Sequence, residues 1–245
     1  MIKELRREIL QASFDAGACH IGSALSCLPI MYELFYEILK DDDVFIFSKA
    51  SGVATYYAIL TDKGYFPKEN LSYYLKNYPL ASKEVPGVLH SVGSLGHGLP
   101  VAVGLACANP NKRVFVLISD GEVEEGTTYE SALFAHQHNL KNLYVYVDNN
   151  GIQACGKTND IINLDLALNF FQKMFPNCYN IHTTKGDGVS FMENTVEWHY
   201  KNLDEELLKQ ALKENEKKFY KRPEMLNGLP LCKKCNEYNC QCKVW

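Results

Sequence analysis

The chain has 245 residues, of which 47% are hydrophobic and 22% charged, and its formal net charge at pH 7 is −4. This balance is typical of a soluble globular protein, and a mildly acidic chain gives no reason to expect nucleic acid or an anionic membrane as a partner. No apolar run reaches about 18 residues, the length that a membrane span needs. The first residues lack the apolar core of a signal peptide, and five of the nine cysteines stand singly, so we expect a cytoplasmic protein with reduced thiols.

The first part of the chain alternates predicted helices with loops of small residues. Apolar side chains at helical spacing predict a helix over residues 1–16. A loop that carries His20 follows, and Ser26 is expected to cap the next helix, with Pro29 in its first turn. The elements expected after it are a buried strand over 44–47 and helices over 53–63 and 68–77.

A glycine-rich turn, residues 93–98, leads into a helix over residues 99–108 whose side chains are mostly small. Another backbone can approach such a helix closely, so we expect it deep in the domain or at an oligomer interface. Later elements are helices over 165–175 and 203–220, with a short strand over 178–184 between them.

The middle of the chain reads as strand, helix, strand. The apolar runs 114–118 and 143–147 are followed closely by Asp120 and Asn150, and residues 127–139 have the length of a crossover helix between parallel strands. Ligands bind beyond the carboxyl ends of parallel strands, and neighbouring strands lie roughly 5 Å apart, so Asp120 and Asn150 are expected to face one site. Such oxygen donors suit Mg²⁺ or Ca²⁺ better than zinc.

Several glycine-rich loops follow strand-like runs. This pattern predicts an α/β fold, a doubly wound, mainly parallel sheet with helices on both faces, and a phosphate-bearing ligand at the strand tips. No loop matches the P-loop or the dinucleotide fingerprint. We expect residues 1–221 to form this domain and residues 222–245 to form a cysteine-rich tail.

Four motifs, taken in order, resemble the transketolase family. Ser119-Asp-Gly-Glu followed by Asp148-Asn-Asn resembles the motif that binds thiamine diphosphate. Three further stretches are similar to transketolases in particular: His20-Ile-Gly-Ser-Ala-Leu-Ser, Gly93-Ser-Leu-Gly-His-Gly-Leu-Pro, and Lys185-Gly-Asp-Gly-Val-Ser-Phe-Met-Glu-Asn with Trp198-His199.

The resemblance implies a thiamine diphosphate-binding fold and the transfer of a two-carbon ketol unit from a ketose donor to an aldehyde or ketone acceptor, such as a sugar. Transketolases also carry a pyrimidine-binding domain, for which this sequence has no counterpart. The resemblance therefore implies the diphosphate- and Mg²⁺-binding subunit of a split enzyme. It would be active only with a separate pyrimidine-binding subunit, in a heterotetramer with two copies of each chain.

The resemblance also implies metal and catalytic residues. Asp120, the side chain of Asn150 and the backbone carbonyl of Ile152 would bind Mg²⁺ or Ca²⁺. The catalytic residues would be His20 at the substrate, Glu125 against a glutamate of the partner, and His199 near the diphosphate and the donor.

A larger set of residues is implied to bind the cofactor. Gly121 would offer its N–H to the diphosphate, and the neighbouring Glu122 belongs to the same set, although an acidic residue at a helix N-terminus needs no ligand to explain it. The remaining members of the set are Ser51, Gly93, Ser94, Leu95, His97, Asn150, Ile152, Lys185 and His199.

The sequence departs from the family in two places. Ser51 stands where transketolases have a histidine that binds cofactor and substrate, and a serine cannot carry a proton near neutral pH. A strand, turn and helix that normally precede the Lys185 loop are missing, which would open the site to a large acceptor. The change at Ser51 leaves room for a thiamine-dependent 2-oxo acid decarboxylase or carboligase. A non-catalytic cofactor-binding subunit is the third alternative, against which the metal ligands and His20 argue.

Four cysteines crowd the end of the chain, at Cys232, Cys235, Cys240 and Cys242. Thiolates so close together can hold Zn²⁺, but the spacing does not match a common zinc ribbon. A reduced tail without metal is the alternative.

Overall fold

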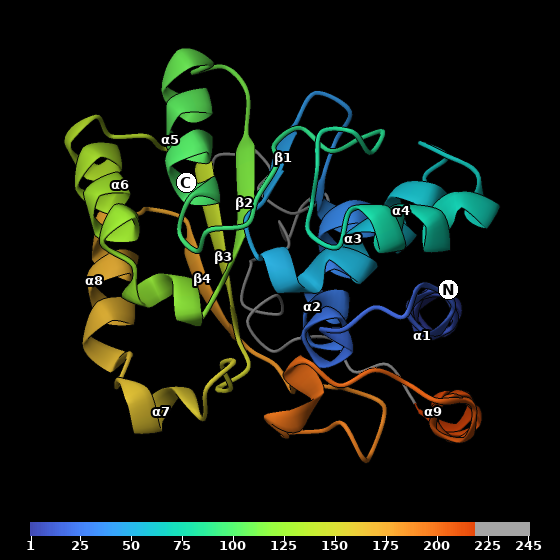
Figure 1. The fold of residues 1–245 in the computed structure, drawn as a ribbon. Coiled ribbons are helices and arrows are strands. Elements are labelled where there is room, and N and C mark those ends of the chain that lie inside the picture. The colour runs from blue at the N-terminus through green and yellow to red at the C-terminus, as the bar shows by residue number, and fades with distance from the viewer. Residues whose placement is uncertain (219–245) are drawn as a thin grey trace, which may run out of the picture.

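The structure is a computed structural model that describes residues 1–218. Within that range the chain forms one β-sheet with helices on both faces (Figure 1). The strands are all parallel and lie in sequence order, which confirms the predicted parallel α/β sheet. They are β1 (Val44–Phe47), β2 (Val114–Ser119), β3 (Leu143–Asn149) and β4 (Cys178–His182).

Two separate hydrophobic cores form because successive side chains of a strand point to opposite faces of the sheet. Phe115 and Leu117 of β2 join the core on one face, and Val116 and Ile118 join the core on the other. Every residue of β2 is buried, as expected of a central strand covered on both sides.

The crossover helices α5, α6 and α8 cover one face of the sheet, whereas the N-terminal helices with α3 cover the other (Figure 1). The bounds of the helices are α1 Ile2–Ala16, α2 Ile21–Glu33, α3 Val53–Asp62, α4 Leu71–Asn77, α5 Gly98–Ala108, α6 Gly126–Gln137, α7 Thr158–Ile161, α8 Asp165–Met174 and α9 Glu205–Lys217.

The start of α2 differs from the prediction. The helix begins at Ile21, directly after His20, whose backbone is left-handed with φ 65° and ψ 16°. Ser26 therefore lies inside the helix instead of capping it, and its hydroxyl donates to Asp148 Oδ2 at 2.7 Å. Local sequence could not reveal this partner, which lies on β3.

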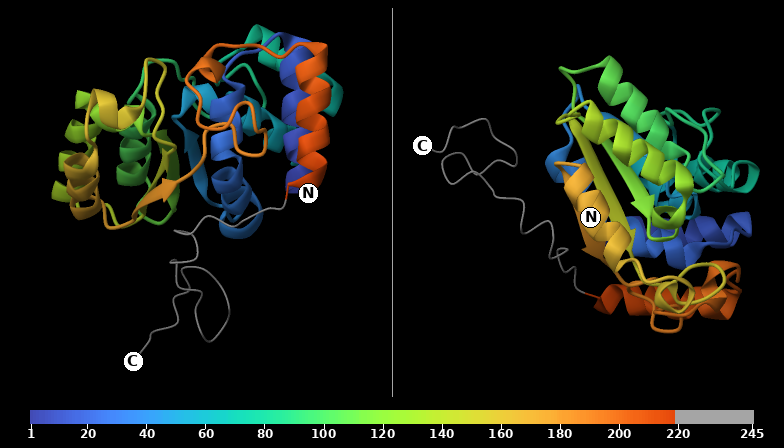
Figure 2. Two further views of the ribbon diagram at one scale, coloured as in Figure 1. Left: turned by 90° about the horizontal axis from the view of Figure 1, so that it is seen from below. Right: turned by 90° about the vertical axis from the view of Figure 1, so that its left-hand side faces the viewer.

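The two ends of the described chain lie side by side, because α9 packs along α1 (Figures 1 and 2). Arg6 of α1 is almost fully buried and donates to Asn215 Oδ1 of α9 at 3.2 Å and to Asp187 Oδ2 at 2.9 Å. None of the helices within residues 1–218 is long and apolar enough to cross a membrane. The four tail cysteines, and the zinc site predicted for them, lie outside the described residues.

Candidate functional site

The carboxyl ends of β2 and β3 meet at the lower edge of the sheet in Figure 1. The Asp120 N–H donates to the Asp148 carbonyl at 3.2 Å, and Asp120 Oδ2 accepts from the Gly151 N–H at 2.9 Å and from Thr158 Oγ1 at 3.0 Å. Burial raises the pKa of Asp120 above its usual value. These contacts place the carboxylate beside the chain that leaves β3, so the residues that follow both strands share one site.

A buried ion pair and a serine hold Asn150. Lys49 Nζ lies 2.9 Å from Asp148 Oδ2, and both side chains are almost fully buried. Ser26 Oγ donates to the same oxygen and accepts from Asn150 Nδ2 at 3.2 Å. Since the amide nitrogen is taken up in this way, Asn150 Oδ1 points the other way and accepts from the Ile152 N–H at 3.0 Å. The network therefore fixes the orientation of the Asn150 amide, with its oxygen towards the Ile152 N–H.

A lysine ammonium already occupies part of this cluster. Lys185 is fully buried, and its Nζ donates to the Ile152 carbonyl at 3.1 Å. Burial lowers the pKa of Lys185 to about 8, and repulsion from Lys49 adds to that effect. A carbonyl that attracts a buried cation has the right chemistry for a metal ligand.

The donor set fits a divalent cation with a diphosphate. The carboxylate of Asp120, the amide oxygen of Asn150 and the carbonyl of Ile152 are the hard oxygen ligands that Mg²⁺ and Ca²⁺ prefer. A Cβ added at Gly121 would meet nothing closer than 3.7 Å, the distance to Gln153. The space beside the Gly121 backbone is therefore open, while its N–H donates to Asp120 Oδ1 at 3.0 Å.

Two histidines far apart in the sequence meet beside this cluster. The backbone N–H of His20 donates to the backbone carbonyl of His199 at 3.1 Å, and the two ring centroids lie 4.9 Å apart in an edge-to-face arrangement. Lys185 Nζ is 2.9 Å from His199 Nδ1, and Tyr200 packs against both rings. Burial, reinforced by Lys185, lowers the pKa of both histidines, that of His199 to about 3, so both rings are neutral at pH 7.

The turn 93–98 borders the site and exposes Ser94, Leu95 and His97 to solvent. Gly96 has a φ of 75°, and a Cβ there would lie 2.6 Å from Thr127 Oγ1, so only glycine fits. Glu125 lies against the same glycine and is half-buried, as is Ser51 in the 3₁₀ turn before α3. The roles of these residues at the cofactor and at the partner stay predictions.

Glu122 is fully buried, and protein groups donate to both of its carboxylate oxygens. Its contact with a cofactor stays a prediction; the observed contacts are those of a residue that holds loops together. Sequence reasoning also missed Lys49, Ser26 and Thr158. Lys49 could have been found, because it is the second residue after β1, and Asp120 was found as the first residue after β2.

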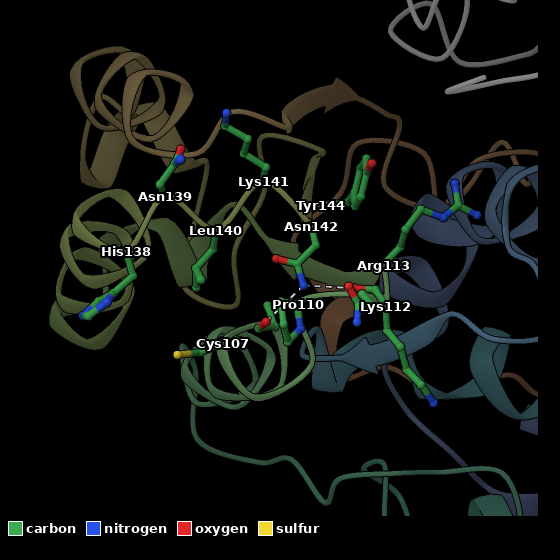
Figure 3. A pocket seen from close by; sticks show the side chains of 12 residues that line it. Cys107, Pro110, Lys112, Arg113, His138, Asn139, Leu140, Lys141, Asn142 and Tyr144 are labelled. Carbon is green, nitrogen blue, oxygen red and sulfur yellow. Dashed lines mark hydrogen bonds between the residues drawn. The ribbon is translucent and has the colours of Figure 1, made fainter. Parts of the chain in front are cut away.

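A hollow of about 580 Å³ lies at the opposite edge of the sheet, where β2 and β3 begin (Figure 3). Its arginine, Arg113, is already paired with Asp43, at 2.9 Å from Nε to Oδ1. Asn142 Nδ2 donates to three carbonyls at the end of α5 and just beyond it. These polar groups already form hydrogen bonds or ion pairs within the chain. The hollow is therefore a structural feature at the opposite edge of the sheet, separate from the strand-tip site.

A parallel sheet with hard oxygen donors and lysines at its carboxyl edge defines the class of α/β proteins that hold a phosphorylated ligand at the strand tips. A family model described as transketolase, thiamine diphosphate binding domain, matches residues 1–197. The chain belongs to the transketolase family, whose members are thiamine diphosphate-dependent transferases.

Its relatives include proteins that are named as transketolase subunits. One subunit of the apulose-4-phosphate transketolase of Actinobacillus succinogenes is 35% identical over 81% of this chain and 88% of its own length. The subunit of the same name from Phocaeicola vulgatus is 30% identical over 91% of this chain and 95% of its own. A 6-deoxy-6-sulfo-D-fructose transketolase subunit from a Clostridium species is 30% identical, over 87% of this chain and 94% of its own.

Solved transketolases share the fold. The enzyme from Leishmania mexicana superposes with a TM-score of 0.79 at 22% identity, over 88% of this chain but only 41% of its own. A mutant of the transketolase of Pichia stipitis gives 0.77 at 22% identity, over 87% of this chain and 40% of its own. The chain thus spans about 40% of the solved transketolases that it matches.

Proposed function

We propose that this chain is the diphosphate- and metal-binding subunit of a split transketolase, which moves a two-carbon ketol unit from a ketose to an aldehyde or ketone acceptor. The observation that carries the proposal is the convergence of Asp120, Asn150 and the Ile152 carbonyl at one edge of the sheet, beside His20 and His199. The match to the thiamine diphosphate binding domain and the relatives named as transketolase subunits support it.

Asp120, Asn150 Oδ1 and the Ile152 carbonyl would hold Mg²⁺, or Ca²⁺ in its place. A cation is needed there because Asp120 and the half-buried Glu124 and Glu125 would otherwise repel a diphosphate. The Gly121 N–H and the Lys185 ammonium would bind the diphosphate oxygens. When bound, thiamine diphosphate supplies the group that stabilises a carbanion next to a former carbonyl.

The histidines would hold and move protons at named atoms. The Lys185 ammonium can only donate, so His199 Nδ1 accepts and the ring carries its proton on Nε2. His199 is thereby set to donate from Nε2 to an oxygen of the donor sugar or the diphosphate. His20, neutral and partly open to solvent, would exchange a proton with the substrate.

The remaining predicted residues would contact the cofactor's rings and the partner. Glu125 would bind a glutamate of the pyrimidine-binding subunit. The other residues that we assign to the cofactor here are Ser51, Gly93, Ser94, Leu95 and His97.

The partner would be a separate pyrimidine-binding chain, in a heterotetramer with two copies of each subunit in the cytoplasm. The substrates would be small sugars. The relatives' names point to a phosphorylated or sulfonated ketose as the substrate class.

The test is cofactor binding and transfer by the chain co-expressed with its partner. Titration calorimetry should show that thiamine diphosphate binds only when Mg²⁺ is present. Asp120→Asn should weaken binding at limiting Mg²⁺ by about 100-fold, the effect of losing a charged ligand that is worth about 3 kcal/mol. Asp160→Asn is the matched control, because that carboxylate is exposed on α7.

Unchanged binding by Asp120→Asn at limiting Mg²⁺ would refute the metal site. Turnover of pyruvate without transfer from any ketose would refute the transketolase activity and favour a 2-oxo acid decarboxylase or carboligase.

A further inference from the structure

One buried carboxylate connects three loops at the strand tips. Glu122 has no exposed surface. Its Oε2 accepts from the Ser119 N–H at 2.7 Å and from Ser119 Oγ at 3.1 Å. Its Oε1 accepts from the Gly96 N–H at 3.1 Å and from the hydroxyl of Ser48. The end of β1, the turn 93–98 and the end of β2 are therefore bound to the same group.

The turn fits closely against this carboxylate. The Gly98 N–H donates to Ser48 Oγ at 3.1 Å, and the same hydroxyl donates to Glu122. Ser48 therefore links Glu122 to the start of α5. The Gly96 carbonyl accepts from Thr127 Oγ1 of α6 at 3.2 Å. Both backbone groups of Gly96 are thus fixed, one by Glu122 and one by Thr127.

We propose that Glu122 is a positioning residue that holds the turn 93–98 in the place where it contacts thiamine diphosphate. The proposal rests on the proposed function, since the turn is the segment we assign to the cofactor. The role of Glu122 would be to position this turn, whereas Asp120 would bind the metal and Glu125 would contact the partner subunit.

A carboxylate suits this task because it only accepts hydrogen bonds. Two backbone N–H groups and two hydroxyls point at its two oxygens. In Glu122→Gln the amide NH₂ would face the N–H of either Gly96 or Ser119, donor against donor. A buried N–H without an acceptor costs about 1–3 kcal/mol, so one side of the clamp should open.

The experiment compares Glu122→Gln with Glu124→Gln in the full-length chain. Glu124 lies two residues away and is half-buried, but within residues 1–218 its carboxylate accepts only from Gln153 Nε2. Hydrogen exchange needs neither partner nor cofactor. In Glu122→Gln we expect the backbone amides of residues 93–99 or of residue 119 to exchange about tenfold faster than in the wild type, while those of α9 are unchanged. In Glu124→Gln all amides should exchange as in the wild type.

Ser48→Ala is a second variant with a smaller change, useful where Glu122→Gln folds poorly. It removes the acceptor of the Gly98 N–H but keeps the carboxylate. It should speed exchange at 96–99 and leave residue 119 protected. Unchanged exchange in both variants would overturn the clamp, whether or not the chain binds thiamine diphosphate.

Kinetics with the partner then test positioning. In Glu122→Gln the apparent KM for thiamine diphosphate should rise by about tenfold, with kcat at saturating cofactor kept close to the wild-type value. A fall in kcat with an unchanged KM would indicate loss of folded protein and would overturn the positioning role. Failure of the wild type to bind thiamine diphosphate would overturn the proposed function instead, a result the exchange data keep separate.

Discussion

Lys185 and His199 show how burial sets the chemistry of single side chains at the strand tips. The ammonium is fully buried, donates to the Ile152 carbonyl and lies 2.9 Å from His199 Nδ1. A positive neighbour in a poorly solvated place disfavours a second positive charge. His199 is for that reason a neutral ring with a fixed tautomer, whereas a solvent-exposed histidine would be partly protonated near neutral pH.

Neutral His199 makes the stability of the fold depend on pH. Its pKa in the folded chain is about 3, below the ordinary value of 6.5. Between these two values the unfolded chain binds a proton at this residue and the folded chain does not, so acidification favours the unfolded chain. This contribution is complete above about pH 6.5 and is lost as the pH falls towards about 3. Its slope is at most about 1.4 kcal/mol per pH unit, and less because the ring is partly solvated.

Urea unfolding between about pH 7 and pH 5 checks this, with His199→Gln as the comparison. Carboxylates contribute to both proteins alike, so the difference between the two slopes isolates the ring. The variant should lose less stability on acidification than the wild type. Equal slopes would mean that His199 titrates normally in the folded chain.

At the scale of elements, α5 shows two uses of glycine in one helix. Gly98 begins the helix against Ser48, where an added Cβ would lie 2.4 Å from the serine side chain. Gly104 lies further along on the exposed surface, where an added Cβ would meet nothing. Ala102 and Ala106 are buried against the sheet, so one face of α5 lies deep in the domain as expected. The alternative position at an oligomer interface stays a prediction for the other face.

Alanine substitution should separate the two glycines. Gly104→Ala should stabilise the chain by about 0.5–1 kcal/mol, because alanine is the better helix former and space is free. Gly98→Ala should cost about 1–3 kcal/mol, because Ser48 is held by Glu122 and cannot move aside freely. Urea unfolding gives both values. A Gly98→Ala variant as stable as the wild type would show that Ser48 can shift without loss.

The elements that the sequence predicted best are those whose signal is local. Residues 44–47, 114–118 and 143–147 are apolar runs that end in polar residues, and they form β1, β2 and β3. Tip positions such as Asp120 could be placed at the site by the same rule. The start of α2 was predicted wrongly, because Ser26 has a buried partner on β3, and the contacts of Glu122 were missed because they join segments distant in the chain. Long-range hydrogen bonds leave no periodic trace in a sequence.

At the scale of the whole molecule, the first and the last described helices, α1 and α9, pack against each other. Arg6 is 1% exposed and reaches both Asp187, in the loop that begins with Lys185, and Asn215 of α9. The family match ends at residue 197, so α9 lies beyond it. This helix therefore helps to fix a loop of the candidate site from outside the matched region.

Asn215→Ala tests this packing. The change removes the acceptor of Arg6 Nη1 and the donor to the Lys3 carbonyl, which Asn215 Nδ2 contacts at 2.9 Å. Arg6 Nε already lacks a hydrogen-bond partner among the described residues, so a second unpaired group on a buried cation should cost about 1–3 kcal/mol. Alanine has the higher helix propensity, which opposes this loss and makes any measured destabilisation a lower bound.

Lys213→Ala is the matched control, since that side chain is exposed on α9. Urea unfolding should separate the two variants by more than about 1 kcal/mol. Hydrogen exchange should show the loop 185–194 opening in Asn215→Ala, because Arg6 then holds Asp187 less firmly. Loss of stability without faster exchange in that loop would mean that the loop is held without Asn215, by the hydrogen bonds from Ser190 to Glu214 and by the ion pair of Asp187 with Lys218.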